Sequence, residues 1–220
     1  ELGIPFVQGE LYRPEDYADF LPVGCSVIHC YSLSPAAYAT KEEYDRQNVY
    51  ATKVLLDVCK RKKINKFIYI SSLSVIGPRA HERQEMTEET PPNPDNDYGR
   101  SKLAAECLVE AFYQQMHIPV SILRLSTLYG PFAHKNSVTF KLFKIAKKPF
   151  QFVVNGGNQP YELNYIKNIV PGILLAYDKV TAFKVYNIGD TQKKTYREVI
   201  TAIARSISSP VKIISLPVFF

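Results

Sequence analysis

Short apolar runs alternate along the chain with longer segments in which apolar residues recur every three or four positions. The runs favour buried strands, which we expect at residues 5–9, 26–30, 66–71 and 120–125. The periodic segments favour amphipathic helices, which we expect at residues 15–20, 41–61 and 97–117. Strands separated by helices are typical of βαβ units. The sequence therefore predicts an α/β fold with a parallel sheet covered on both faces.

The pattern changes after Tyr129-Gly130-Pro131. Residues 132–220 mix a basic helical stretch, a glycine-rich turn and short strands, at 141–148, 155–158, 151–154 and 185–188. A last helix is expected over 196–207, because Thr195 and Glu198 have the spacing of a capping box. We therefore divide the chain into residues 1–131, which hold the parallel sheet, and residues 132–220, a smaller and separate lobe.

The composition is that of an ordinary globular protein, with 46% hydrophobic residues and a formal net charge of +6. This modest excess suits an enzyme whose ligands carry phosphates. A nucleic-acid-binding protein would concentrate its basic residues more strongly, so we expect no nucleic-acid partner. The densest basic run, residues 60–63, closes an apolar-periodic segment and is interpreted as the cationic end of a helix.

The four cysteines form no CxxC pair, and Cys25 and Cys30 would point to opposite faces of the strand that carries His29. We therefore expect no metal site, and we expect a reducing compartment. No stretch approaches the roughly 18 apolar residues that a spanning helix needs, and residues 1–10 do not resemble a signal peptide. These features predict a cytoplasmic protein without a membrane span.

Tyr98 and Lys102 stand four positions apart on the second long helix and share one of its faces. An ammonium beside a phenol stabilises the phenolate and lowers its pKa, so that the tyrosine can exchange a proton as an alcohol and a ketone interconvert. Such a pair alone is a weak signal, since most are ordinary surface neighbours. Its context strengthens it: Ser71 and Ser72 end a predicted strand, at the edge where α/β folds bind ligands, and Ser72 is suited to polarise a carbonyl.

Three blocks in order, KFIYISSLSVIGP, TEETPPNPDNDYGRSKLAAE and ILRLSTLYGP, resemble the extended short-chain dehydrogenase/reductases, the NAD-dependent epimerase/dehydratase family. VIHCYS, QNVYATKVLLDVCK and VYNIGD with TYREVI resemble further blocks of that family. The resemblance covers nearly the whole chain. It implies a Rossmann-like fold that binds NAD or NADP, with a smaller substrate-binding lobe, and an oxidoreductase that moves a hydride at a secondary alcohol or ketone.

The resemblance also implies roles for individual residues. Tyr98 is the acid/base, Lys102 binds the nicotinamide ribose and tunes Tyr98, Ser72 takes the catalytic Ser/Thr position, and Asn48 matches a helix asparagine near the active site. Further cofactor contacts are implied at the strand ends, namely His29, Cys30, Tyr31, Ile70, Ser71, Leu125, Ser126 and Thr127. For His29, packing in the core is the simpler interpretation, because one histidine on an apolar strand commonly packs there.

The substrate stays open at this point. Cys30-Tyr31 and Lys167-Asn168 differ from the family's usual residues, and Ile76 and Thr127 differ from those that sugar-nucleotide epimerases usually carry. The sequence around Tyr98 is similar to that of reductases of the hydroxysteroid and dihydroflavonol type. A sugar nucleotide, a steroid-like molecule or another secondary alcohol or ketone are the alternatives, with a homodimer as the expected assembly. A non-catalytic binding protein that keeps the fold is the alternative from a different class.

The family's glycine-rich phosphate loop has no counterpart in this sequence, because the paired glycines 156–157 do not lie between a strand and a helix. The chain starts at what resembles the third strand of the family's sheet. We therefore expect these residues to be part of a longer protein, and we expect residues 1–220 alone to lack activity. The choice between NAD and NADP stays open, since the residues that decide it follow the family's second strand.

Overall fold

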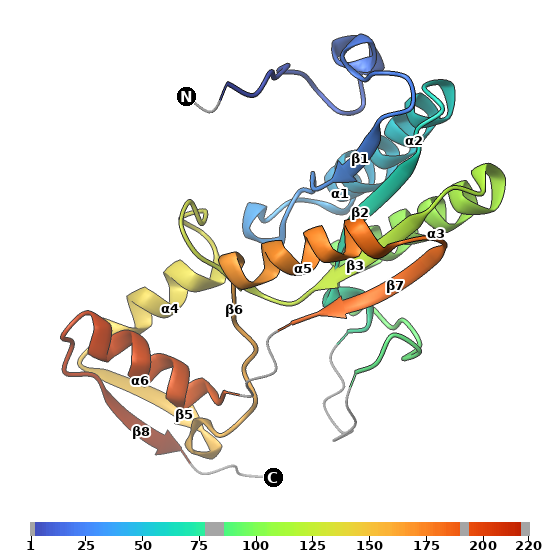
Figure 1. The fold of residues 1–220 in the computed structure, drawn as a ribbon. Helices are drawn as coiled ribbons and strands as arrows, with labels where there is room; N and C mark the ends of the chain where they lie inside the picture. The colour runs from blue at the N-terminus through green and yellow to red at the C-terminus, as the bar shows by residue number, and fades with distance from the viewer. Residues whose placement is uncertain (1–2, 78–85, 190–193, 217–220) are drawn as a thin grey trace. The chain divides into compact units, whose positions relative to one another are not determined.

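The computed structural model describes residues 3–77, 86–189 and 194–216. Its main sheet has four parallel strands in the order β1-β2-β3-β7, formed by Ser26–His29, Lys66–Ser72, Val120–Leu125 and Phe183–Ile188 (Figure 1). All six residues of β3 are buried. This explains the uninterrupted apolar character of its sequence, because a strand inside a parallel sheet meets side chains on both faces. The predicted α/β fold with a parallel sheet is confirmed.

The first long helix is continuous in space but changes its winding. Thr40 caps α1 (Lys41–Tyr44) through a capping box with Glu43, a π-helical segment η4 follows (Asp45–Tyr50), and α2 runs over Ala51–Arg61. Inserted π turns are rare and are found frequently at functional sites. η4 contains Asn48, so the one irregular turn of this helix coincides with a predicted site residue.

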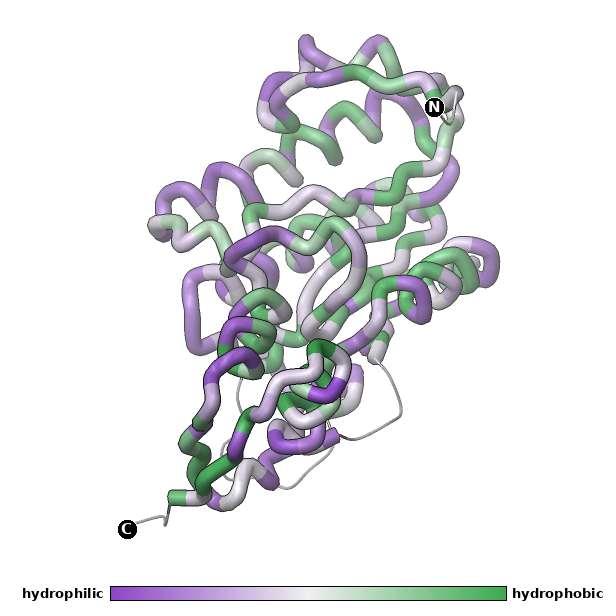
Figure 2. Tube along the Cα trace, turned by 90° about the vertical axis from the view of Figure 1, so that its left-hand side faces the viewer, coloured by the Kyte–Doolittle hydropathy of each residue, from purple (hydrophilic) through white to green (hydrophobic). Residues whose placement is uncertain are grey.

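The second long helix, α3 (Asp97–Met116), packs against α2 and against β2 (Figure 1). It ends at His117, which adopts a left-handed conformation. Apolar and polar positions are interspersed along the chain (Figure 2). The apolar positions meet in a core that includes Leu55, Val58, Phe67, Val109, Phe112 and Ile122. Burial of this core holds the two helices on one face of the sheet.

The N-terminal segment differs from the prediction in two respects. Residues 5–9 form no strand, since none of the described residues offers their backbone a ladder partner. Residues 15–20 form two 3₁₀ turns, η1 (Pro14–Asp16) and η2 (Ala18–Phe20), in place of one helix. 3₁₀ turns of the same length also occur at η3 (Pro35–Ala37) and η5 (Leu73–Val75). The predicted loop 77–97 lies partly outside the described residues.

The C-terminal segments form their own core. α4 (Val138–Ala146) packs on α6 (Tyr196–Ser206), and the parallel pair β5 (Phe150–Val154) and β8 (Lys212–Leu216) meets the turn η6 (Asn155–Gly157). A second short pair consists of β4 (Leu128–Tyr129) and β6 (Asn164–Tyr165). The predicted capping box of Thr195 and Glu198 is confirmed. The helix α5 (Ile166–Lys179) was not predicted, because Pro171 interrupts its sequence pattern.

By their internal contacts the residues group into two units, Glu1–Leu125 with Gly172–Ile188, and Ser126–Pro171 with Gly189–Phe220. β7 therefore pairs with β3 in the main sheet, whereas its sequence position suggested the smaller lobe. An apolar run joins the sheet in which it finds a partner strand. The sequence of the run does not specify that partner. The division at residue 131 stays a prediction about folding units.

Candidate active site

The candidate site residues of the first unit gather at the carboxyl edge of the parallel sheet. β2 ends in Ser71-Ser72, β1 ends at His29, and Ser72 lies opposite Leu125 of β3. Parallel strands bring their carboxyl ends to the same edge, which is where open α/β sheets bind ligands. The loop after β1 and the first turn of α3 complete the site.

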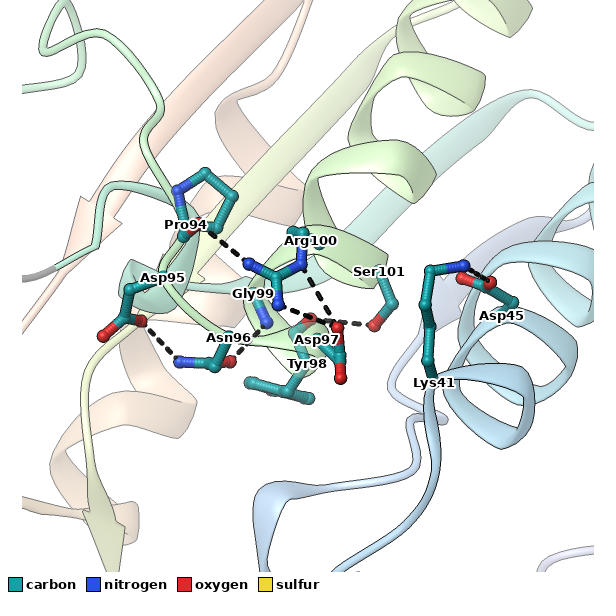
Figure 3. Close-up of polar contacts among 10 residues, drawn as sticks. All are labelled: Lys41, Asp45, Pro94, Asp95, Asn96, Asp97, Tyr98, Gly99, Arg100 and Ser101. Carbon is teal, nitrogen blue, oxygen red and sulfur yellow. Dashed lines mark hydrogen bonds and ion pairs between the residues drawn. The ribbon is translucent and has the colours of Figure 1, made fainter.

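The start of α3 is fixed by its cap and by a close approach. Asn96 Oδ1 accepts from Gly99 N at 2.8 Å, and Ser101 Oγ donates to Tyr98 O at 2.8 Å (Figure 3). A Cβ at Gly99 would lie 2.4 Å from the carbonyl oxygen of Ser74. Only glycine therefore allows the first turn of α3 to press against the turn that follows Ser72.

Tyr98 is brought to Ser72 by this packing. The side chains of Ser72 and Ser32 lie near enough to lower the pKa of its hydroxyl, and its ring lies edge-on to Tyr44 at 6.0 Å between centroids. Burial raises the pKa of Tyr98, while the two hydroxyl contacts oppose that rise. The pKa of Tyr98 is therefore raised, whereas the sequence predicted that Lys102 would lower it. The free energy of removing the phenolate from water outweighs the stabilisation that its neighbours provide.

Lys102 is almost completely buried one helical turn further along α3. Its Nζ donates to the carbonyl oxygen of Ile70 at 2.7 Å and lies 4.2 Å from the ring centre of Tyr69. Burial lowers the pKa of Lys102 to about 7, and the negative charge of Glu106 opposes that shift. Lys102 is thus anchored to β2, and its charge changes near neutral pH.

Ser71 points to a different network from Ser72. Its hydroxyl donates to Glu106 Oε1 at 2.5 Å, and Glu106 forms a bidentate ion pair with Arg124, with Nη2 and Oε2 at 2.7 Å. Glu106 and Arg124 are both buried. This network joins β2, β3 and α3, and the predicted cofactor contact of Ser71 stays a prediction.

His29 lies in the core, 3% exposed, where its Nε2 is 2.9 Å from Thr52 Oγ1 and its ring lies tilted against that of Tyr69, with 5.3 Å between centroids. Burial, with the nearby charge of Lys102, lowers the pKa of His29 to about 3, so the imidazole is neutral at physiological pH. These contacts match the simpler of the two interpretations of His29. Its predicted cofactor contact stays a prediction.

Asn48 is buried and ties three segments together. Its Oδ1 accepts from Leu33 N at 2.7 Å, and its Nδ2 donates to Leu33 O at 3.1 Å and to Ser101 Oγ at 2.9 Å. The amide therefore links η4, the loop after β1 and α3. Its predicted role near the active site stays a prediction.

The two residues after His29 are exposed. Burial of part of its surface raises the pKa of the Cys30 thiol, and the charge of Lys102 opposes this. Tyr31 donates from its hydroxyl to Gln47 Oε1 at 2.5 Å. Leu125 ends β3 and is buried, whereas Ser126 and Thr127 belong to the C-terminal unit, where Asn164 Nδ2 bonds to Ser126 Oγ and Asn164 N donates to Thr127 O.

Three residues of the site were missed by sequence reasoning, namely Ser32, Tyr44 and Gly99. Ser32 stands inside the block VIHCYS, and Gly99 inside the segment around Tyr98, so both signals were present in the sequence. Their roles depend on which loop meets α3, which no local pattern specifies. Among the residues the structure describes, no group of three or more His, Cys, Asp or Glu side chains is placed to hold a metal ion.

Comparison with known proteins places this geometry in a family. Residues 2–189 match the NAD dependent epimerase/dehydratase family. Human (Homo sapiens) dTDP-D-glucose 4,6-dehydratase is 33% identical over 148 residues, which cover 67% of this chain and 42% of that protein. The chain thus spans less than half the length of this relative.

Two solved structures are similar to this chain in fold as well as in sequence. UDP-glucuronic acid 4-epimerase from Bacillus cereus, in complex with NAD, is 27% identical with a TM-score of 0.75, over 87% of this chain and 62% of that one. RMD from Pseudomonas aeruginosa, complexed with NADPH, is 25% identical with a TM-score of 0.84, over 98% and 77% respectively. The protein therefore belongs to the NAD-dependent epimerase/dehydratase family, whose named members here are enzymes.

Proposed function

We propose that this chain carries the acid/base centre of an NAD(P)-dependent enzyme that oxidises or reduces a secondary alcohol or ketone on a nucleotide sugar. One observation carries the proposal: Tyr98 and Ser72 lie together at the carboxyl edge of the sheet, one helical turn from the buried Lys102, whose Nζ is 2.7 Å from Ile70 O. A phenol, a hydroxyl and an ammonium together form a set that exchanges one proton with a substrate oxygen.

The donors present fit the ribose end of a nicotinamide cofactor. Lys102 Nζ has three donors, of which one is used on Ile70 O, so further N–H groups remain for sugar hydroxyls at the sheet edge. Tyr98 adds its hydroxyl beside them. When bound, the nicotinamide supplies the hydride acceptor or donor.

The chain's own residues handle the proton. Because burial raises the pKa of Tyr98, the phenol is its resting form, suited to give a proton to a ketone oxygen that gains a hydride. In the other direction the phenolate takes the proton of an alcohol, and the Ser72 hydroxyl and the charge of Lys102 stabilise it. Ser72 also donates a hydrogen bond to the substrate oxygen as negative charge develops there.

The nucleotide-sugar assignment is supported by the relatives, one named as a dTDP-D-glucose dehydratase and another as a UDP-glucuronic acid epimerase. We propose that the C-terminal unit binds part of this substrate. It contains a pocket of about 470 Å³ whose lining includes the apolar Phe143 and Ile203, one lysine, Lys194, and two carboxylates, Glu162 and Glu198. The apolar side chains suit a planar base, Lys194 is the cation available to a phosphate, and the carboxylates suit sugar hydroxyls.

Substituting Tyr98→Phe in the intact protein tests the proposal. Turnover of dTDP-glucose and UDP-glucose should fall by about 10²- to 10⁴-fold, while NADH binding, followed by fluorescence, stays within a factor of two or three. Tyr113→Phe on the same helix is the matched control and should leave both unchanged. Full turnover by the Tyr98 variant, or no nucleotide binding by the wild type, would contradict the proposal, and the second outcome would favour a non-catalytic protein.

We also propose a cytoplasmic location and a homodimer. The first is supported by four free cysteines, and no helix among the described residues is long and apolar enough to cross a membrane. Light scattering of the intact protein would test the second.

A further inference from the structure

We propose that Glu88 is a positioning residue for Tyr98, on which its carboxylate acts through the segment that leads into α3. This inference rests on the proposed acid/base function of Tyr98. We call this segment, residues 86–96, the strap. It contacts β7 at one end and α3 at the other, and all three belong to the first unit. The contacts along the strap link a side chain at β7 to a side chain of α3.

At its first end the strap is bonded to β7. Glu88 Oε1 accepts from Asn187 N at 2.8 Å, and Met86 O accepts from Asn187 Nδ2 at 3.3 Å. Thr87 N donates to Thr90 Oγ1 at 3.0 Å, which closes a turn around Glu88. A hydrogen bond to a carboxylate is stronger than one between neutral groups. We therefore expect Glu88 to contribute most of the attachment of the strap to β7.

Further along, the strap contacts two glycines. Asn93 N donates to Val75 O at 3.0 Å. A Cβ at Gly77 would collide with the carbonyl oxygen of Asn93, and a Cβ at Gly99 would lie 2.9 Å from Pro94 Cβ. Residues without a Cβ therefore allow the strap to touch both the turn that follows β2 and the first turn of α3. The position of the strap thus affects how these two turns meet.

Prolines stiffen the strap between its two ends, since three of the six residues 90–95 are proline, whose ring fixes φ. Asn96 then caps α3: its Oδ1 accepts from Gly99 N at 2.8 Å (Figure 3), and Tyr98 is the second residue of the helix. A stiff segment passes a displacement from one end to the other, whereas a flexible one absorbs it. Loss of the Glu88 contact should therefore affect the cap of α3 and the position of Tyr98.

Hydrogen exchange of backbone amides in the intact protein, followed by NMR, tests this coupling without turnover. Glu88→Ala should speed the exchange of Asn187 N–H and of Gly99 N–H about 3- to 10-fold, the size expected from one lost hydrogen bond. The N–H of the buried Leu123 should keep its rate, which excludes global unfolding. Glu88→Gln keeps an acceptor oxygen and should restore both rates. Glu89→Ala removes the adjacent exposed carboxylate and is the matched control.

Steady-state kinetics of the same variants, with dTDP-glucose and UDP-glucose, tests the consequence for Tyr98. Glu88→Ala should lower kcat about 3- to 10-fold, because the acid/base group is less well placed, and should leave the Kd of NADH within about a factor of two. Glu88→Gln should restore kcat, and Glu89→Ala should match the wild type.

Unchanged exchange at Asn187 in Glu88→Ala would overturn the inference, as would faster exchange there with an unchanged rate at Gly99 or an unchanged kcat. A fall of kcat that Glu88→Gln does not restore would overturn it too, since the contact with Asn187 would not be its cause. Faster exchange at both amides in a protein without turnover would support the coupling and reject the proposed function.

Discussion

His29 is a titratable residue whose burial in the core disfavours its charged form. Its neutral ring lies between Thr52 and Tyr69, and burial lowers its pKa to about 3. In the unfolded chain a histidine titrates near its ordinary value of about 6.5. The unfolded state therefore binds more protons between these two pH values, and stability is lost as the pH falls through that window.

We predict that His29→Gln makes the protein less sensitive to acid. Between pH 6.5 and pH 4.5 the wild type should lose roughly 2 to 3 kcal/mol of unfolding free energy through this residue, and the variant should lose less by that amount. Urea unfolding at the two pH values measures both. His117→Gln, at the end of α3, serves as a control, and equal acid sensitivity of His29→Gln and wild type would show that the imidazole is not held neutral.

Lys102 makes the stability depend on pH in the same way, but at higher pH. Its ordinary pKa is 10.5 and burial lowers it to about 7, so the unfolded state binds more protons in between and stability rises with pH across that range. We predict a gain of roughly 2 kcal/mol between pH 7 and pH 9, absent in Lys102→Met. Urea unfolding at these pH values is the measurement. A gain that persists in the Met variant would assign it to other groups.

At the scale of one element, the first turn of α3 shows packing overriding helix propensity. Alanine is favoured over glycine inside a helix by about 1 kcal/mol, so propensity alone predicts that Gly99→Ala stabilises the protein. The structure predicts the reverse, because the new Cβ would lie 2.4 Å from Ser74 O and 2.9 Å from Pro94 Cβ.

We expect Gly99→Ala to destabilise the protein by about 1 to 3 kcal/mol and to reduce turnover, since α3 must move away from the turn after Ser72. Thermal unfolding and kcat check the two effects together. Ala104→Gly, at an exposed position of the same helix, should cost only the propensity difference and leave kcat unchanged. A stabilised Gly99→Ala variant would mean that the close approach does not exist.

At the scale of the whole first unit, the ion pair of Glu106 and Arg124 joins β2, β3 and α3. Both groups are buried, and Arg124 Nη1 has no hydrogen-bond partner. Removing one member leaves an uncompensated buried charge, whereas replacing both with apolar residues is often close to neutral.

We predict that Glu106→Leu and Arg124→Leu each cost about 3 to 5 kcal/mol of unfolding free energy, and that the double variant recovers most of that loss. A double-mutant cycle by urea unfolding measures the coupling. Additive losses in the double variant would show that the pair is not a coupled unit.

The sequence by itself determined the order and type of the elements that build the first unit. Apolar runs specified β1, β2 and β3, and periodicity with Thr40 specified the long helix that holds α1 and α2, because these signals come from residues close in sequence. The spacing of Tyr98 and Lys102, with Ser72 at a strand end, indicated the site for the same reason.

Only the tertiary structure decided what depends on distant segments. The pairing of β7 with β3, the hydrogen bond of Asn48 with Ser101 and the close approach at Gly99 all join residues far apart in the chain. The direction of the Tyr98 pKa belongs to the same class, since burial is a property of the assembled core. Local patterns record which residues are apolar or polar, but the free energy of desolvation depends on which surfaces finally meet.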